Sequence, residues 1–144
     1  MQNNRRAGRP FSSALARLRG ARLRPTRQRL ALARLLLEGA DRHVTAESLH
    51  AEAVAAEVKV SLATVYNNLH QFTSAGLLRE VVVDSGVTYF DTNATDHHHM
   101  YYESEGHLVD VEESDIVLSK LPHIPKGARV KRVDVVIRVE NTSD

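Results

Sequence analysis

The 144-residue sequence contains no cysteine. Disulfides and thiolate metal sites are therefore excluded, and any bound metal must rely on histidine nitrogens and carboxylate oxygens. Long apolar runs are also missing, because none approaches the roughly 20 residues that span a bilayer and the start MQNNRRAGRPFSS has no segment of signal-peptide type. We therefore expect a cytoplasmic protein of one or two small domains that does not bind a membrane.

The net charge of +1 conceals a separation of charge along the chain. Every formally charged residue before Glu38 is an arginine, whereas between Arg79 and Lys120 all of them are acidic. This separation predicts one region that faces phosphate groups and another that holds cations. The alternative is a disordered arginine-rich tail beside an ordinary solvated acidic surface.

Three helices are predicted in the first half of the chain, over residues 27–38, 46–57 and 62–75. Thr45 can cap the second helix and Ser61 the third. The apolar side of the third helix is formed by Leu62, Val65, Leu69 and Phe72. Its opposite side carries no acid and presents the amide and hydroxyl groups of Thr64, Asn67, Asn68 and Gln71.

Short amide and hydroxyl groups on an exposed helix face are typical of a helix that reads bases in the major groove. The stretch LLREVVVDSGVTYFD then predicts a β-hairpin that turns at Asp84, Ser85 and Gly86. Three helices followed by a hairpin indicate a winged helix. The alternative is a plain helical hairpin whose polar face meets only water.

Tyr66 is our first candidate for contacting DNA, because its ring can cover a thymine methyl group while its hydroxyl reaches a phosphate. The other candidates either assist it from the same helix or hold the phosphate backbone: Thr64, Asn67, Asn68, Arg24 and Arg27. The alternative for Tyr66 is a partly buried ring of the core.

The last third of the chain predicts a small α/β unit. Its expected elements are strands over residues 96–103 and 107–111, a helix over 113–121 and a strand over 130–139. A sheet this small leaves edges and an apolar face that need cover. A symmetric homodimer would supply that cover and would present two reading helices to a partly palindromic operator.

Three consecutive histidines, His97, His98 and His99, open this unit. On a strand, His97 and His99 share one face while His98 points to the other. All three therefore cannot ligate one ion without distorting the strand. The alternative is a solvated strand edge.

Five fragments together resemble the ferric uptake regulator superfamily: LRPTRQR, HVTAESL, SLATVYNNL, FTSAGLL and FDTNATDHHH, in this order and spacing. The resemblance implies an α+β chain with a winged-helix DNA-binding domain over residues 1–93, including a basic N-terminal extension. A small α/β dimerisation domain would follow over residues 94–144. Such a chain would act as a homodimeric, metal-responsive transcription factor on double-stranded DNA.

The resemblance also implies a regulatory metal site that takes ligands from both domains: His43, Asp91, His97, His99 and Asp110. These nitrogen and oxygen ligands suit Mn²⁺, Fe²⁺ or Zn²⁺. A bound ion would fix the hinge and thereby gate DNA binding. The family's structural zinc, which paired Cys-x-x-Cys motifs hold, is not expected, because Tyr102 and Glu105 stand in register with the first cysteine pair.

Within the superfamily, ATVYNNL, the histidine run and LPHIPKGARVKRVDVVIRVE are similar to the iron response regulator branch. That branch senses iron through haem, which implies haem binding at His97, His98 and His99. The expected function is an iron-responsive regulator, mainly a repressor, of iron and haem metabolism genes. Haem at these histidines would disturb the metal ligands, so we expect it to weaken operator binding.

Two alternatives are kept. One is a repressor that senses Fe²⁺ or Mn²⁺ directly, without haem control. The other is a small histidine and carboxylate metalloenzyme, but the chain has no His-Glu-x-x-His, nucleophile elbow or phosphate loop, so we expect no enzymatic activity.

Overall fold

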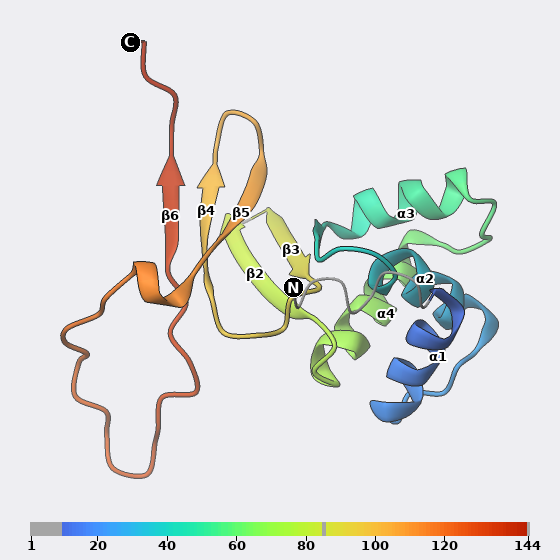
Figure 1. Ribbon diagram of the computed structural model, residues 1–144, viewed down its shortest axis with the longest axis horizontal. Helices are drawn as coiled ribbons and strands as arrows, with labels where there is room; N and C mark the ends of the chain where they lie inside the picture. The colour runs from blue at the N-terminus through green and yellow to red at the C-terminus, as the bar shows by residue number, and fades with distance from the viewer. Residues whose placement is uncertain (1–9, 85, 144) are drawn as a thin grey trace. The chain divides into compact units, whose positions relative to one another are not determined.

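A computed structural model describes residues 10–84 and 86–143. Residues 1–9, where the predicted basic extension begins, and Ser85 of the predicted turn lie outside the described residues. The chain divides into two compact units between Ala94 and Thr95 (Figure 1). No helix within the described ranges is both long and apolar enough to cross a bilayer.

Over residues 10–84 and 86–94, the first unit contains four helices and a three-stranded antiparallel sheet. The helices are α1 (Pro10–Gly20), α2 (Arg27–Leu37), α3 (Ala46–Ala55) and α4 (Leu62–Ser74). The strands β1 (His43–Val44), β2 (Arg79–Asp84) and β3 (Val87–Asp91) lie in the order β1-β3-β2. The structure confirms the three helices and the hairpin predicted from the sequence, which are α2, α3, α4 and β2–β3.

Hydrogen-bonding side chains fix where α2, α3 and α4 begin. The hydroxyl of Thr26 accepts from the backbone N–H of Arg29, and that of Ser61 accepts from Thr64. Thr45 and Ser48 form a reciprocal capping box at the start of α3. Each cap satisfies a backbone donor that would otherwise lack a partner at the helix end, which typically contributes about 1 kcal/mol.

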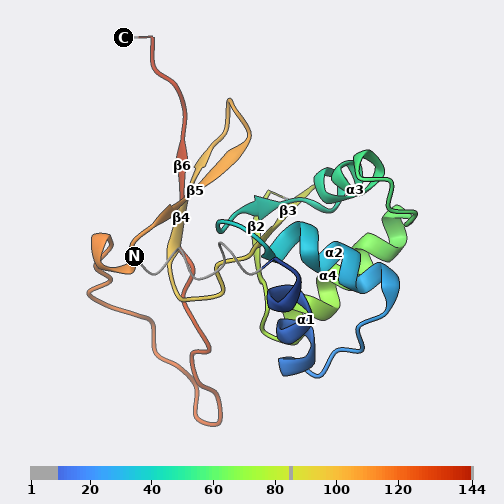
Figure 2. The ribbon, with the colours of Figure 1, turned by 45° about the vertical axis from the view of Figure 1, so that its right-hand side comes forward.

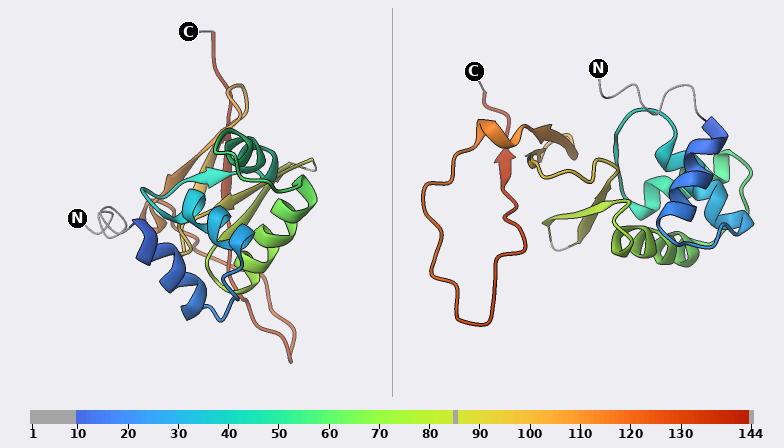
Figure 3. Two further views of the ribbon diagram at one scale, coloured as in Figure 1. Left: turned by 90° about the vertical axis from the view of Figure 1, so that its right-hand side faces the viewer. Right: turned by 60° about the horizontal axis from the view of Figure 1, so that its bottom comes forward.

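The core of the first unit is formed by apolar residues of all four helices and of the sheet. Its fully buried larger members include Leu18, Leu32, Leu36, Leu49, Val65, Leu69, Phe72 and Phe90. The predicted apolar side of α4 thus faces the core, and α2 contacts both α1 and α4 (Figure 3). Burial of the apolar side therefore turns the opposite, polar side of α4 away from the core.

Helix α1 was not predicted, because arginines dominate the sequence before residue 27 and no helix was assigned there. In the structure Ala14 and Leu18 are fully buried and α1 packs against α2. Two apolar residues four positions apart are a weak signal among many arginines. Arg17 and Arg19 lie in the last turn, where positive charge is favourable for the helix dipole.

The second unit contains a three-stranded sheet in the order β5-β4-β6 (Figure 2). Strand β4 (His98–Tyr102) is central, with β5 (His107–Val111) antiparallel and β6 (Val136–Val139) parallel to it. A short 3-10 helix, η2 (Glu113–Asp115), follows β5.

Two predictions for the second unit were wrong in extent. The expected helix over residues 113–121 is only η2, and the expected strand over 130–139 is only β6. Val117, Leu118 and Leu121 are exposed, so the described part of the chain does not cover the apolar side of the expected helix. Most helical stability in proteins comes from such packing, and without it a short helix is marginal.

Candidate metal-binding residues and nucleic-acid interface

His43 and Asp91 face each other across the first unit's sheet, because β1 pairs with β3 in the register His43↔Asp91. His43 Nε2 lies 3.1 Å from Asp91 Oδ2. The side chain of Asp91 is fully buried, and its Oδ1 accepts a 2.9 Å hydrogen bond from the backbone N–H of Asn93. The pair therefore offers one imidazole nitrogen and one carboxylate oxygen at a fixed spacing.

A second layer of hydrogen bonds flanks this pair and was not predicted. The Thr92 hydroxyl accepts from the backbone N–H of Arg42 at 2.8 Å, and the Thr92 N–H donates to the Arg42 carbonyl at 3.0 Å. The Arg42 guanidinium in turn pairs with the Glu52 carboxylate of α3. Arg42 precedes His43 and Thr92 follows Asp91, so these contacts extend the short β1–β3 pairing beyond the two candidate ligands.

In the second unit, His97, His99 and Asp110 form a cluster. Asp110 Oδ1 lies 3.1 Å from His97 Nε2 and 3.5 Å from His99 Nε2. One ligand atom from each of these residues lies within 4.8 Å of the other two. His99 and Asp110 are direct partners in the β4–β5 register, and both histidines are almost fully buried.

The hydrogen bonding of His97 favours metal ligation. Its Nδ1 lies 2.6 Å from the carbonyl oxygen of Thr95, and a carbonyl only accepts, so Nδ1 carries the proton. In the neutral ring the lone pair of Nε2 then faces the Asp110 carboxylate. The lone pair of His97 Nε2 and the Asp110 carboxylate oxygen repel each other at this distance unless a proton or a cation lies between them. In metal sites the cation takes this place, and a hydrogen bond to the other ring nitrogen orients the imidazole. The cluster therefore fits a divalent cation.

His98 is oriented differently from its neighbours, in agreement with the predicted alternation. Its ring is buried, and Nδ1 accepts a 3.2 Å hydrogen bond from the backbone N–H of Val135. A neutral His98 in this arrangement carries its proton on Nε2. Ligation of a haem iron through Nε2 would require this proton to leave or to move to Nδ1, where it would displace the hydrogen bond.

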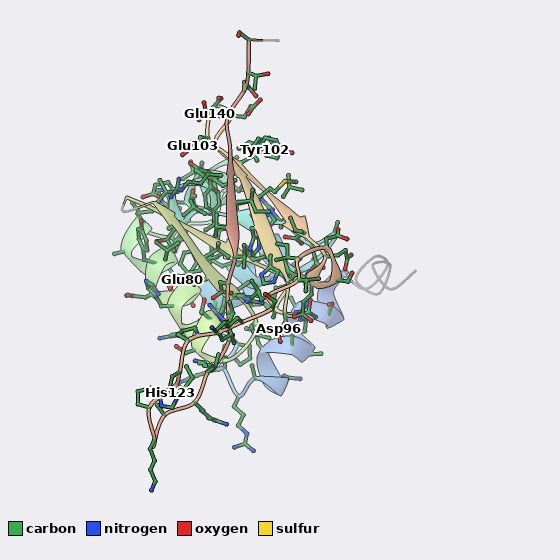
Figure 4. The ribbon with its side chains drawn as sticks, turned by 90° about the vertical axis from the view of Figure 1, so that its left-hand side faces the viewer. Glu80, Asp96, Tyr102, Glu103, His123 and Glu140 are labelled. Carbon is green, nitrogen blue, oxygen red and sulfur yellow. The ribbon has the colours of Figure 1, made fainter. Side chains whose placement is uncertain are left out.

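The remaining histidines of the second unit lie apart from the cluster. His107 is exposed and stacks on Tyr102 with ring centroids 4.9 Å apart. His123 lies on the long segment that follows η2, away from the strands of its unit (Figure 4). Neither residue therefore adds a ligand to His97, His99 and Asp110.

On α4, Tyr66 is partly exposed rather than a core ring, with 36% of its surface accessible. Its hydroxyl donates a 2.9 Å hydrogen bond to Glu47 Oε2 on α3. This hydrogen bond and the nearby negative charge raise the pKa of Tyr66 above 10.0. Asn67 is exposed beside it, and Arg24 and Arg27 are exposed near the start of α2. These four side chains are accessible to solvent, and their contacts with nucleic acid stay a prediction.

Asn68 does not agree with its expected role as a base-contacting helper, because it is directed inward and only 7% exposed. Its Nδ2 donates to the carbonyl of Thr64 at 2.9 Å, and its Oδ1 accepts from Arg29 Nε at 3.0 Å. Both ends of the amide are thus used inside the first unit. Thr64 is half-buried and accepts at Oγ1 from the Ser61 hydroxyl.

Arg29 is a structurally important residue that the sequence did not identify. Besides Asn68, its guanidinium donates to Gln71 of α4 and to the carbonyl oxygen of Arg24, the latter at 3.1 Å. A planar guanidinium can satisfy several acceptors at once. Arg29 therefore holds α4 in place on α2, and no periodic pattern in the sequence marks this role.

Comparison with known proteins places these features in a family. The model of the ferric uptake regulator family matches residues 20–138. The peroxide-responsive repressor PerR of Staphylococcus aureus strain Mu50 is 33% identical over 102 residues, which are 71% of this chain and 68% of PerR.

Two solved structures are similar over almost their whole length. The ferric uptake regulator from Pseudomonas aeruginosa with manganese has a TM-score of 0.68 and 26% identity, covering 90% of this chain and 98% of that one. The Vibrio cholerae ferric uptake regulator has a TM-score of 0.68 and 19% identity, and the match covers 88% of this chain and 98% of that one. The likeness confirms the predicted α+β fold class, while the iron response regulator branch stays a prediction. The chain belongs to the ferric uptake regulator family.

Proposed function

We propose that this chain is a metal-responsive transcriptional regulator, mainly a repressor, which binds operator DNA as a homodimer. Residues 1–93 would form the DNA-binding domain and residues 94–144 the dimerisation domain. The observation that carries the proposal is the pair of partial ligand sets, His43 with Asp91 and His97 with His99 and Asp110. Family membership supplies the regulatory context.

The proposed metal centre uses all five ligands on one Mn²⁺, Fe²⁺ or Zn²⁺ ion. Two ligands in the first unit are too few for a tight site, and three in the second leave coordination positions open. Asp91 and His97 are six positions apart in the sequence. That stretch spans at most about 20 Å, a length that allows both ligand sets to reach one ion.

An ion shared by both units would restrict how they move relative to each other. The ion favours one orientation of the two units only as far as it binds that orientation more tightly than the others. In allosteric systems this difference in binding free energy is typically about 1–3 kcal/mol. The DNA-binding orientation would therefore be favoured when metal is bound. The ion would thus influence DNA binding by α4 through the orientation of the units and not through a contact with α4.

The homodimer is supported by apolar side chains that the second unit leaves exposed. They are Val109, Val117, Leu118, Leu121, Val130 and Ile137. Strands β5 and β6 are also the edges of their sheet. A second copy would cover such a surface and present a second α4 to the operator.

Control by haem is the more specific part of the proposal. Haem bound at His97, His98 or His99 would withdraw or reorient metal ligands and so weaken operator binding of a regulator of iron and haem metabolism genes. The similarity to the iron response regulator branch in the histidine run and in the closing residues supports this reading.

Direct sensing of Fe²⁺ or Mn²⁺ without haem is the second candidate. The His98 hydrogen bond to Val135 favours it, because that contact leaves the proton on the nitrogen that would bind iron. The similar Pseudomonas aeruginosa structure with manganese also supports it. Haem titration into the protein bound to its operator separates the two, since unchanged affinity after stoichiometric haem uptake leaves only direct sensing.

The test of the main proposal is selection from a pool of randomised duplexes by the full chain with and without Mn²⁺, followed by affinity and sedimentation measurements. We expect enrichment of a partly palindromic sequence, tighter binding with Mn²⁺ and a dimer on the duplex. Metal-dependent turnover without specific duplex binding would instead support the metalloenzyme alternative.

A further inference from the structure

The hydroxyl group of Tyr66 is already engaged within the first unit. It donates its proton to Glu47 Oε2 at 2.9 Å, which joins the exposed side of α4 to the first turn of α3. Both residues are exposed, so the contact is not imposed by packing in the core. The Tyr66 ring also lies near His70 one turn further along α4, with centroids 6.3 Å apart.

This contact limits what Tyr66 can do on DNA. A phosphate oxygen only accepts hydrogen bonds, and the Tyr66 hydroxyl proton is already donated to a carboxylate. The Glu47 charge also repels a phosphate that approaches the hydroxyl. While the bond is kept, the ring remains available to cover an apolar group in the groove, and the thymine methyl is the apolar group that the major groove offers.

We infer that Glu47 is a positioning residue for base reading, because it holds the Tyr66 hydroxyl and thereby directs the Tyr66 ring to thymine methyl groups rather than to phosphates. This inference rests on the proposed DNA-binding function and adds a specificity-determining residue to it. Tyr66 then contributes to sequence selectivity, while Arg24 and Arg27 contribute to binding of any duplex.

Glu47 also lies in the first turn of α3, where a negative charge stabilises the helix. A purely structural role would depend on that charge and not on reaching Tyr66. Glu47→Asp keeps the charge but shortens the side chain by one methylene, whereas Glu47→Gln keeps the length and an acceptor oxygen but loses the charge. The two variants therefore separate positioning of Tyr66 from helix stabilisation.

The experiment uses the full chain with Mn²⁺ and the duplex that it enriches from a randomised pool. Each thymine of a half-site is replaced in turn by deoxyuridine, which removes only the methyl group, and the ratio of the two affinities is measured. For a methyl group covered by Tyr66 we expect about a fourfold ratio in the unsubstituted protein, as for burial of one carbon. Glu57→Ala is the matched control, because Glu57 is an exposed acid just after the C-terminal end of α3.

We expect Glu47→Asp and Glu47→Ala to lower the ratio toward one, and Glu47→Gln and Glu57→Ala to retain it. In a Tyr66→Phe background, which keeps the ring but removes the donor, Glu47→Ala should cause no further change. The inference is overturned if the ratio is one in the unsubstituted protein, if it is insensitive to Glu47→Asp, or if Glu47→Ala acts equally in both backgrounds. In those cases DNA binding itself stands, whereas failure to enrich any duplex removes the proposed function as well.

Discussion

His43 and Asp91 are brought to 3.1 Å by backbone pairing between β1 and β3 rather than by their own side chains. Strand β1 has only two residues, and Val44 pairs with Phe90 beside the candidate ligands. Phe90 belongs to the hydrophobic core, so packing of the core and spacing of the ligands are coupled. Changes to the backbone around this pair should therefore alter metal affinity as well as stability.

Replacement of Asp91 by asparagine should greatly weaken Mn²⁺ binding. The substitution removes the charge of a fully buried carboxylate and puts an amide nitrogen in competition with its oxygen. We expect a loss larger than the roughly 10- to 100-fold that removal of an outer partner of a ligand typically costs. Titration of metal-free protein with Mn²⁺, followed by calorimetry, measures the loss.

The matched control for this substitution is Asp96→Asn, since Asp96 is an exposed acid outside the five proposed ligands. It should bind Mn²⁺ as the unsubstituted protein does. Equal affinities of the Asp91 and Asp96 variants would remove Asp91 from the proposed centre.

Thr92→Val tests the hydrogen bonds that flank the ligand pair. Valine has the shape of threonine but cannot accept from the Arg42 N–H, and Thr92 is only 1% exposed. Leaving the partly buried Arg42 N–H without its partner costs about 1–3 kcal/mol of unfolding free energy. We also expect a fall in Mn²⁺ affinity, because Thr92 directly follows Asp91.

For the Thr92 experiment the control is Thr88→Val, because Thr88 is a half-buried threonine of β3 that lies outside the contacts of the ligand pair. Urea unfolding of metal-free protein gives the stability change, and titration with Mn²⁺ gives the affinity. A stability loss without any affinity loss would show that Thr92 supports the fold but not the ligands.

The elements that the sequence predicted are those whose signal is local. Helix α4 was predicted because Leu62, Val65, Leu69 and Phe72 recur on one side, and all but Leu62 are fully buried. The opposite directions of His98 and its neighbours followed from strand alternation alone. Such patterns depend only on the period of the element.

What the sequence missed depends on contacts between distant segments. The inward direction of Asn68 requires Arg29 on another helix, so a helical projection alone places this amide on the polar side. Helix α1 depends on burial of Leu18 against α2. The expected helix over residues 113–121 is the opposite case, because its apolar pattern is present in the sequence but no described residue of this chain buries it.

Arg29→Lys should disturb α4 although it preserves the charge. Lysine has a single ammonium group and cannot serve Asn68, Gln71 and the Arg24 carbonyl as the planar guanidinium does. Breaking a partly buried network of this kind should lower the unfolding free energy by about 1–3 kcal/mol and weaken binding of the enriched duplex.

Arg27→Lys is the control for the Arg29 substitution, since Arg27 is exposed at the start of α2. It should leave stability within about 0.5 kcal/mol of the unsubstituted protein. Urea midpoints of both variants test this comparison, and indistinguishable midpoints would contradict the role assigned to Arg29.

Glu38→Gln should reduce the dependence of stability on acid pH. Burial raises the pKa of Glu38 above 4.5, an effect that nearby Arg34 partly offsets. Among the described residues, the buried Oε2 of Glu38 has no hydrogen-bond partner. The folded state therefore binds this proton more tightly than the unfolded state does. Its contribution to stability is fully present below pH 4.5 and is lost as the pH rises through the raised pKa.

Glutamine is neutral throughout this range, so the Glu38 variant should lose less stability than the unsubstituted protein between about pH 4 and about pH 7. Comparison of urea midpoints at several pH values tests this, because all other titrating groups are common to both proteins. Glu57→Gln is the control, since an exposed carboxyl group should leave the profile unchanged. Parallel profiles for the Glu38 variant and the unsubstituted protein would show that burial at the end of α2 does not disfavour the charged carboxylate.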